Sequence, residues 1–164
     1  MKFAREPYSQ ALVEEMKPLW TEHFAEVAKY KDIPLDPNIA LYEQMDRLGT
    51  LIIFTVRQAE RLAGYQIFMM SAHPHFQKSL QAVQDLLFIS KAWRLGLAGL
   101  QFVKWCDYEL AQAGVQIVYQ HINSDRDIGA LLHRADYVLH DIVYSKRLDG
   151  LKWDRQDPSP PHQL

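Results

Sequence analysis

The stretch "KAWRLGLAGLQFVKWCDYEL", residues 91–110, gathers one arginine and three small residues within six positions and then continues as an amphipathic run. The small residues are Gly96, Ala98 and Gly99. Small side chains let a helix begin close against a sheet, and they also leave the backbone N–H groups of its first turn open to an anion. Taken alone, these residues fit a tight packing turn and an anion site equally well.

The segments on both sides of this stretch supply its structural context. The apolar run 79–90 and the β-branched run 115–122 each predict a strand, and the amphipathic pattern between them predicts a helix over 96–113 that stops at Gly114. A strand–helix–strand unit of this kind implies a parallel pair of strands. It also places the start of the helix at the carboxyl end of the first strand, where ligands of open α/β sheets bind.

The rest of the chain predicts further helices and strands around this unit. Helices are expected at 9–30, where Pro18 would kink or divide the run, at 38–45, and at 125–135 with Asp125 as N-cap. Strands are expected at 50–57, 61–72 and 137–148. The fold class is therefore α/β with a mixed α+β sheet, mostly antiparallel with one parallel pair. We expect a single domain over 1–150 and a flexible tail over 151–164.

Composition excludes several classes of function. The chain has 164 residues and a net charge of -2, which gives no general positive field for nucleic acid or an anionic membrane. Its one cysteine, Cys106, lies in a helical apolar pattern, and no cluster of metal ligands is visible. No apolar run approaches the roughly 18 residues of a membrane span, and the start lacks a signal-peptide core, so we expect a cytoplasmic protein.

The segment 83–148 resembles the GNAT superfamily of N-acetyltransferases, and the stretches "HPHFQKSLQAVQDLLF" and "YQH" resemble a phage and bacterial subgroup of acetyltransferase-like proteins. The family signature is Arg or Gln, two variable residues, Gly, a variable residue, then Gly or Ala. Here "RLGLAG" matches its first and last positions with Arg94 and Gly99, while Leu97 replaces the usual glycine and Gly96 stands one place early. The strand "LLFIS" precedes it, and "AGVQIVYQHI" and "LLHRADYVLHDIVYSKRL" resemble the later strand, helix and final strand.

The resemblance implies that acetyl-CoA binds at this loop, with its pyrophosphate on the backbone N–H groups and its pantetheine arm beside the end of the strand. It also implies that the parallel strands splay to admit the thioester. The cofactor-binding residues expected on this basis are Phe88, Ile89, Ser90, Arg94, Leu95, Gly96, Leu97, Ala98, Gly99 and Leu100.

Candidates for the proton transfers of acetyl transfer are Asp85, His121, Tyr119 and His75. Each has a plainer interpretation: Asp85 as a solvated strand residue, Tyr119 or His121 as a core residue with a satisfied hydrogen bond, and His75, with His73, as loop polarity. His23 fits an exposed helix position, and Tyr137 and Tyr144 fit packing. Leu132 occupies the place where the family often has a tyrosine acid, so the thiolate leaves without it, another residue serves, or the protein is not a transferase.

The sequence thus leads to two functional hypotheses. The first is an N-acetyltransferase that transfers an acetyl group from acetyl-CoA to the amine of a small molecule or protein. The second is a catalytically silent GNAT-like module that binds acyl-CoA or a protein partner, which Leu97 and Leu132 favour. The expected partners are acetyl-CoA and an amine acceptor, without nucleic acid or membrane, and a homodimer is suggested by analogy with the family.

Overall fold

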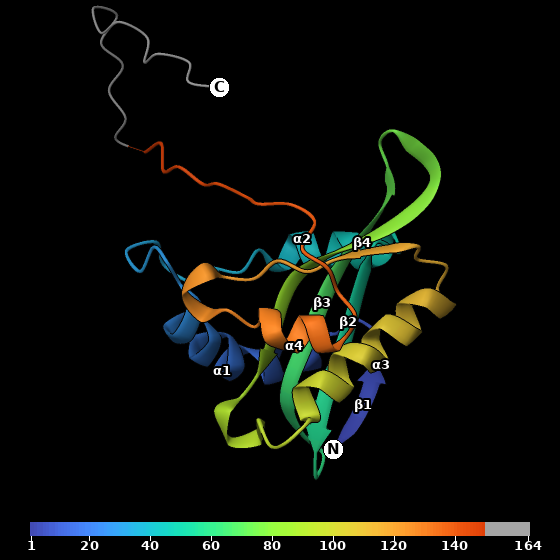
Figure 1. Ribbon diagram of the computed structural model, residues 1–164. Coiled ribbons are helices and arrows are strands. Elements are labelled where there is room, and N and C mark those ends of the chain that lie inside the picture. The colour runs from blue at the N-terminus through green and yellow to red at the C-terminus, as the bar shows by residue number, and fades with distance from the viewer. Residues whose placement is uncertain (150–164) are drawn as a thin grey trace, which may run out of the picture.

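The computed structural model describes residues 1–149, so the expected tail over 151–164 lies outside the described residues. One five-stranded sheet runs in chain order from β1 to β5 (Figure 1). Its strands are β1 (Lys2–Arg5), β2 (Leu51–Gln58), β3 (Arg61–His73), β4 (Phe76–Ile89) and β5 (Ile117–Tyr119).

The pairing of the strands confirms the mixed sheet. β1 to β4 pair antiparallel, whereas β5 runs parallel to β4. β1 is the one strand that the sequence did not predict. It is four residues long and pairs with β2 in the register Phe3 to Val56, and a segment so short, with charged residues at both ends, carries little alternation to detect.

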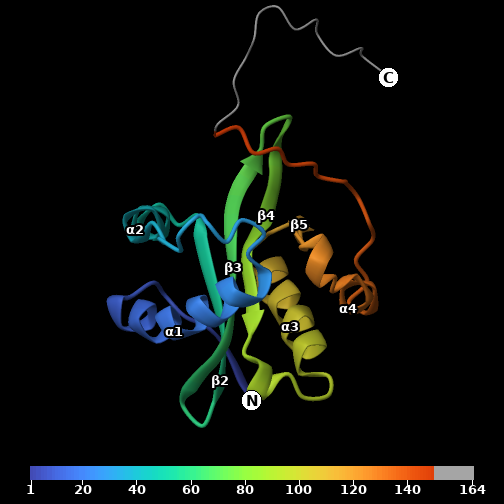
Figure 2. The same cartoon turned by 90° about the vertical axis from the view of Figure 1, so that its left-hand side faces the viewer.

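Helices cover both faces of the sheet (Figure 2). α1 (Gln10–Val27) and α2 (Ile39–Arg47) lie on one face, and α3 (Ala98–Gln112) and α4 (Gly129–Arg134) lie on the other. Two short 3-10 turns, η1 (Lys91–Trp93) and η2 (Ser124–Arg126), precede α3 and α4. One apolar core fills the space between α1 and the sheet, and a second fills the space between α3 and the sheet.

Three local predictions are wrong in detail. Pro18 does not divide α1, because buried residues on both sides of it, among them Met16 and Trp20, pack on the same sheet and offset the missing backbone hydrogen bond. Asp125 does not cap α4, because it lies inside η2, whose N-cap is Asn123. α3 begins at Ala98 because Gly96 adopts a φ of +55°, which is not helical.

The predicted final strand over 137–148 is also wrong. None of its residues belongs to a strand, and Val138, Val143 and Tyr144 are among its exposed side chains. The segment does have strand-like composition, but such a preference is realised only beside an available edge. β5 offers an edge of three residues, which is too short to organise a twelve-residue strand.

The parallel pair separates soon after it forms. β5 pairs with Gln81–Val83 only, while β4 continues to Ile89, so the strands part beyond Val83. A register shift opposite Ile67 and Phe68 marks a β-bulge in β4 at this point, which bends the strand locally. On the other side, the amide of Asn123 donates to the Val27 carbonyl over 2.6 Å and turns the chain away from β4.

No helix among residues 1–149 combines the length and the apolar composition that crossing a membrane requires.

Candidate functional site

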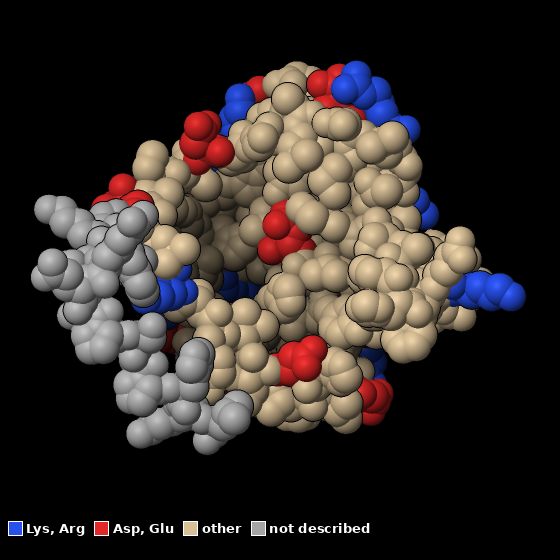
Figure 3. Space-filling model, turned by 90° about the horizontal axis from the view of Figure 1, so that it is seen from above, with Lys and Arg blue, Asp and Glu red and all other residues tan. Residues whose placement is uncertain are grey.

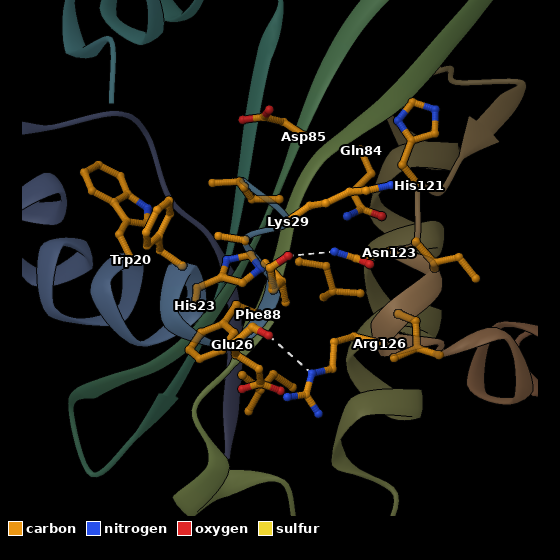
Figure 4. A pocket seen from close by; sticks show the side chains of 18 of the residues that line it. Trp20, His23, Glu26, Lys29, Gln84, Asp85, Phe88, His121, Asn123 and Arg126 are labelled. Atoms are coloured by element: carbon orange, nitrogen blue, oxygen red, sulfur yellow. Dashed lines mark hydrogen bonds between the residues drawn. The ribbon is translucent and has the colours of Figure 1, made fainter. Parts of the chain in front are cut away.

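A pocket of about 800 Å³ opens where β4 and β5 part (Figures 3 and 4). Residues 84–89 of β4 line it on one side, and residues 121–131 after β5 line it on another. The end of α1 and the loop 28–37 form a further wall, and the start of α3 closes its lower end. The pocket therefore lies at the carboxyl end of the first strand of the parallel pair, as the sequence predicted.

Backbone N–H groups without acceptors lie in the first turn of α3 and the loop before it, where Gly96 and Gly99 line the lower end of this pocket. In this loop and the first turn of α3, the Ala98 N–H donates a hydrogen bond to the Leu95 carbonyl, and the Gln101 N–H donates one to the Leu97 carbonyl. Within the described residues, the amides of Gly96, Leu97, Gly99 and Leu100 have no backbone acceptor. Unpaired N–H groups at the start of a helix favour an anion, both as donors and through the helix dipole.

Arg94 fixes the loop rather than presenting a free charge. Its guanidinium makes a bidentate ion pair with Glu26 of α1, at 2.7 and 2.9 Å, and its Nε donates to the Ile89 carbonyl over 2.6 Å. The hydrogen bond from Arg94 lowers the pKa of Glu26 below its ordinary value. Both charges are thus mutually satisfied, and the loop is tied to α1.

Two hydrogen bonds link the opposite walls of the pocket (Figure 4). Asn123 donates to the Val27 carbonyl, and Arg126 Nε donates to the Glu26 carbonyl over 3.2 Å. Both acceptors belong to the last turn of α1, whose carbonyls have no partner within the helix. In Figure 4 these links lie between the end of the pocket that holds Asp85 and His121 and the end near the start of α3.

The expected coenzyme residues divide into two groups in the structure. Five line the pocket: Phe88, Ile89, Arg94, Gly96 and Gly99. The other five, Ser90, Leu95, Leu97, Ala98 and Leu100, do not line it, although Leu97 and Leu100 contribute unpaired amides. The Ser90 hydroxyl instead donates to Glu22 of α1 over 3.1 Å.

Asp85 lies at the upper end of the pocket, on the bulged part of β4 (Figure 4). The Tyr42 hydroxyl of α2 donates a short hydrogen bond to its Oδ2, and within residues 1–149 no cation lies within 4 Å of the carboxylate. Burial and this hydrogen bond raise the pKa of Tyr42, so the hydroxyl stays a donor at neutral pH. Beside Asp85, the buried Gln84 has a side-chain oxygen without a partner among the described residues.

The other three candidates for proton transfer occupy different places. His121 lines the pocket across from Asp85, whereas Tyr119 does not line it. The expectation that Tyr119 and His121 share one strand face is wrong, because β5 ends at Tyr119. The structure does not bring His75 to the pocket. It lies with His73 at the β3–β4 turn, exposed and at the tip of the hairpin (Figure 1).

His23 is a pocket residue that the sequence analysis placed on an exposed helix face. It is 9% exposed, its Nδ1 lies 3.0 Å from the Tyr65 hydroxyl, and its ring stacks on Phe88 at 4.7 Å between centroids. Burial lowers the pKa of His23 to about 4, so the ring is neutral at pH 7. The helical periodicity of the sequence could have identified this position, since His23 continues the buried stripe of α1. A polar residue is more common on a solvent-facing side of a helix, which favoured the exposed assignment.

Within residues 1–149 no three His, Cys, Asp or Glu side chains come together as a metal site. His73 and His75 face each other with ring centroids 5.9 Å apart and have no third ligand in this part of the chain. Cys106 is buried in the core under α3, and burial raises the pKa of its thiol, so it is a packing residue.

The sequence matches no protein-family model and no curated protein. Among solved structures, it is similar to a transcriptional regulator from Bacillus halodurans C-125, with a TM-score of 0.72, 11% identity, and coverage of 89% of this chain and 99% of that chain. It is also similar to an aminoglycoside acetyltransferase from an uncultured soil metagenomic sample, with a TM-score of 0.69, 13% identity, and coverage of 90% and 98%.

A third similar structure is glucosamine-6-phosphate N-acetyltransferase from Arabidopsis thaliana, with a TM-score of 0.68, 10% identity, and coverage of 91% of this chain and 100% of that chain. The alignments span nearly whole chains on both sides, so the likeness concerns the complete fold. The chain has the fold of the GNAT N-acetyltransferases, which confirms the resemblance at the level of architecture.

Proposed function

We propose that this protein is an acetyl-CoA-dependent N-acetyltransferase. The observation that carries the proposal is the set of four unpaired N–H groups at Gly96, Leu97, Gly99 and Leu100, because Gly96 and Gly99 line a pocket of about 800 Å³ that enters a splayed sheet. Such a set suits a diphosphate, because a coenzyme phosphate supplies the acceptors that the backbone lacks. The fold it shares with known N-acetyltransferases supports the same assignment.

The open edge of β4 suits the arm of the coenzyme. Beyond Val83 this edge has no strand beside it among the described residues, and an unpaired edge is a template for an extended ligand. Acetyl-CoA would supply the activated acyl group. The chain's own contribution is to hold the coenzyme along β4 and the amine at the upper end of the pocket, so that two reactants meet as one bound unit.

Asp85 and His121 are the residues best placed for proton transfer. They lie on opposite walls of the pocket, at the end away from the α3 loop (Figure 4). Asp85 has one oxygen without a partner among the described residues, which can accept a proton from an incoming ammonium group. His121 is exposed to the pocket and can donate a proton to the thiolate that leaves when the thioester bond breaks. We propose these two as base and acid.

One observation favours the second candidate function, a silent coenzyme-binding or regulatory module. Leu132, at the place of the usual tyrosine acid, is buried against Val103 and Ala135 and has no proton to give. Tyr137, nearby in sequence, donates its hydroxyl to Asp107 over 2.5 Å. One of the similar structures is described as a transcriptional regulator, so the fold alone does not decide between the two functions.

A thermal-shift titration with acetyl-CoA, followed by release of free thiol in the presence of a panel of amines, tests the proposal. We expect a concentration-dependent rise in melting temperature and thiol release that requires both the amine and the enzyme. A rise without thiol release across the whole panel would favour the silent module, and no rise would reject the transferase and the coenzyme-binding form of the silent module.

A further inference from the structure

The upper end of the pocket combines one free carboxylate with an apolar wall. We propose that the acceptor is a small amine that carries a single positive charge on an apolar, arylalkyl-type body. This inference deepens the proposed function, and turnover of such an amine rests on it. The binding site itself is argued from the acceptor end of the pocket alone, so it can be tested without the coenzyme.

The charge of the expected acceptor follows from Asp85. Its Oδ2 is held by Tyr42, which fixes the carboxylate, while its Oδ1 has no partner among the described residues. Asp85 is half-buried and has no counter-ion among the described residues. Burial makes an unpaired negative charge unfavourable, and the positive charge of a bound ammonium group would offset this cost.

A second, independent observation points to a ligand at the same place. Gln84 is 8% exposed, lines the pocket, and its Oε1 has no hydrogen-bond partner among the described residues. In Figure 4 its amide group lies below the Asp85 carboxylate and the His121 ring. A buried amide oxygen left without a donor costs free energy, so a ligand N–H group at this position would be favourable. The acceptor amine has the donors that this oxygen needs.

The other pocket charges favour a single ammonium group beside Asp85. Glu26 is already paired with Arg94, and Asp36 lines the pocket without an ion pair among the described residues but is exposed on the loop beyond α1, where solvent screens its charge. Lys29 and Arg126 add two positive charges to the same lining. A polycationic acceptor would therefore place its second and third ammonium groups against cations or apolar surface, which is unfavourable.

The body of the acceptor follows from the apolar wall of the pocket that Asp85 lines. Apolar and aromatic side chains dominate it, and in Figure 3 the opening is bordered mainly by uncharged residues. Two of them, Ile33 and Leu35, are 47% and 42% exposed on the loop 28–37, although they line the pocket. Exposed large apolar side chains at a pocket mouth mark a surface that an apolar ligand covers. The wall consists of Trp20, Phe24, Ile33, Pro34, Leu35, Pro37, Tyr42 and Leu86.

Calorimetric binding of 2-phenylethylamine to the full-length protein, without coenzyme, is the direct test. We expect measurable binding that is at least about tenfold tighter than that of a polycationic aminoglycoside such as kanamycin and of a pentapeptide with a free N-terminal alanine. The same three amines are then compared by kcat/KM for thiol release with acetyl-CoA. Preference for the polycation or the peptide in the binding assay would overturn the inference.

Variants locate the site. Asp85→Asn keeps an acceptor for Tyr42 but removes the charge, and we expect it to weaken phenylethylamine binding at least about tenfold. Glu43→Gln is the matched control. Glu43 follows Tyr42 in α2 and does not line the pocket, so removing its carboxylate should leave binding unchanged. Ile33→Asp, on an exposed loop position, should weaken phenylethylamine binding and narrow the preference over kanamycin. Equal binding by wild type and Asp85→Asn would refute the role of Asp85.

The two levels of the proposal fail separately. If phenylethylamine binds through Asp85 but no amine releases thiol from acetyl-CoA, the acceptor site stands and the transferase function does not. If the protein releases thiol from acetyl-CoA with kanamycin or the peptide as acceptor, and phenylethylamine neither binds nor reacts, the transferase function stands and the acceptor class is wrong.

Discussion

The two ends of the pocket are built in different ways. The lower end is one contiguous loop, residues 94–100, that offers backbone N–H groups and has small residues at Gly96, Ala98 and Gly99. The upper end is assembled from α1, α2, the loop 28–37, β4 and the chain after β5, and it offers side chains. Backbone groups are the same in every residue, so the lower end fits a shared coenzyme, while the upper end can vary with the acceptor. The proposed coenzyme site is therefore a local property of the sequence, and the proposed acceptor site is a property of the fold.

The largest effect is expected from Gly99→Glu, which attacks the lower end alone. A Cβ at this position would lie 3.1 Å from Cδ1 of Leu131, and the carboxylate would compete with the coenzyme phosphates for the helix start. We expect affinity for acetyl-CoA to fall about 100-fold or more, measured by the thermal shift. Gln112→Glu adds the same charge at the far end of α3 and should retain the shift. A Gly99→Glu protein that folds and binds normally would place the coenzyme elsewhere.

His121→Ala attacks the upper end and should separate chemistry from coenzyme binding. We expect kcat for thiol release to fall about 100-fold, the usual size of a lost proton-transfer group, with an unchanged acetyl-CoA thermal shift. Tyr119→Phe serves as control, since Tyr119 does not line the pocket and its loss should change kcat little. Comparable rates for His121→Ala and wild type would remove the imidazole from the mechanism.

The sequence predicted the lower end because its information is contiguous. Small residues after an apolar run, with a helix behind them, place Gly96 and Gly99 in the pocket before any tertiary contact is known. The order of β2, β3, β4, α3 and β5 was predicted for the same reason, since each element has its own hydrophobic periodicity and is bounded by polar or turn-forming residues.

Two residues of the upper end, Asp85 and His121, were candidates from the sequence, but the side chains that surround them could not be predicted, because these residues meet only through the fold. Tyr42 reaches Asp85 across 43 positions, and Asn123 reaches Val27 across 96. The sequence predicts His121 on a strand face, but β5 ends at Tyr119, two residues before His121. The chain then turns toward α1, where Asn123 donates to the Val27 carbonyl. The segment 137–148 failed for a related reason, since its composition suits a strand and the fold gives it too short an edge. Local preference was correct in these places, and a distant partner decided otherwise.

A smaller effect concerns the boundary between the two ends, where His23 is buried against Phe88. Its pKa is about 4 in the folded protein, below the ordinary 6.5, so the native state favours the neutral ring. The stability this contributes is present above pH 6.5 and is lost as pH falls through 4. We expect the free energy of unfolding to drop by about 2 kcal/mol between pH 7 and pH 5 through this residue, measured by urea unfolding.

His23→Gln should remove most of that decrease, because glutamine can bond to Tyr65 without titrating. His75→Gln is the control, since His75 is exposed at the β3–β4 turn and should leave the slope in place. If His23→Gln keeps the full decrease between pH 7 and pH 5, the buried ring is not its source.

The smallest effect is expected at Leu97, where the family signature has glycine. Its φ of -98° and ψ of 9° suit any residue, its side chain is 49% exposed, and it does not line the pocket. The proposed coenzyme site would use its N–H group and not its side chain, so Leu97→Gly should change acetyl-CoA affinity less than about twofold. The added backbone freedom should cost about 0.5–1 kcal/mol of stability. A marked gain in affinity for Leu97→Gly would mean that this leucine obstructs the loop, and would favour the regulatory module over the transferase.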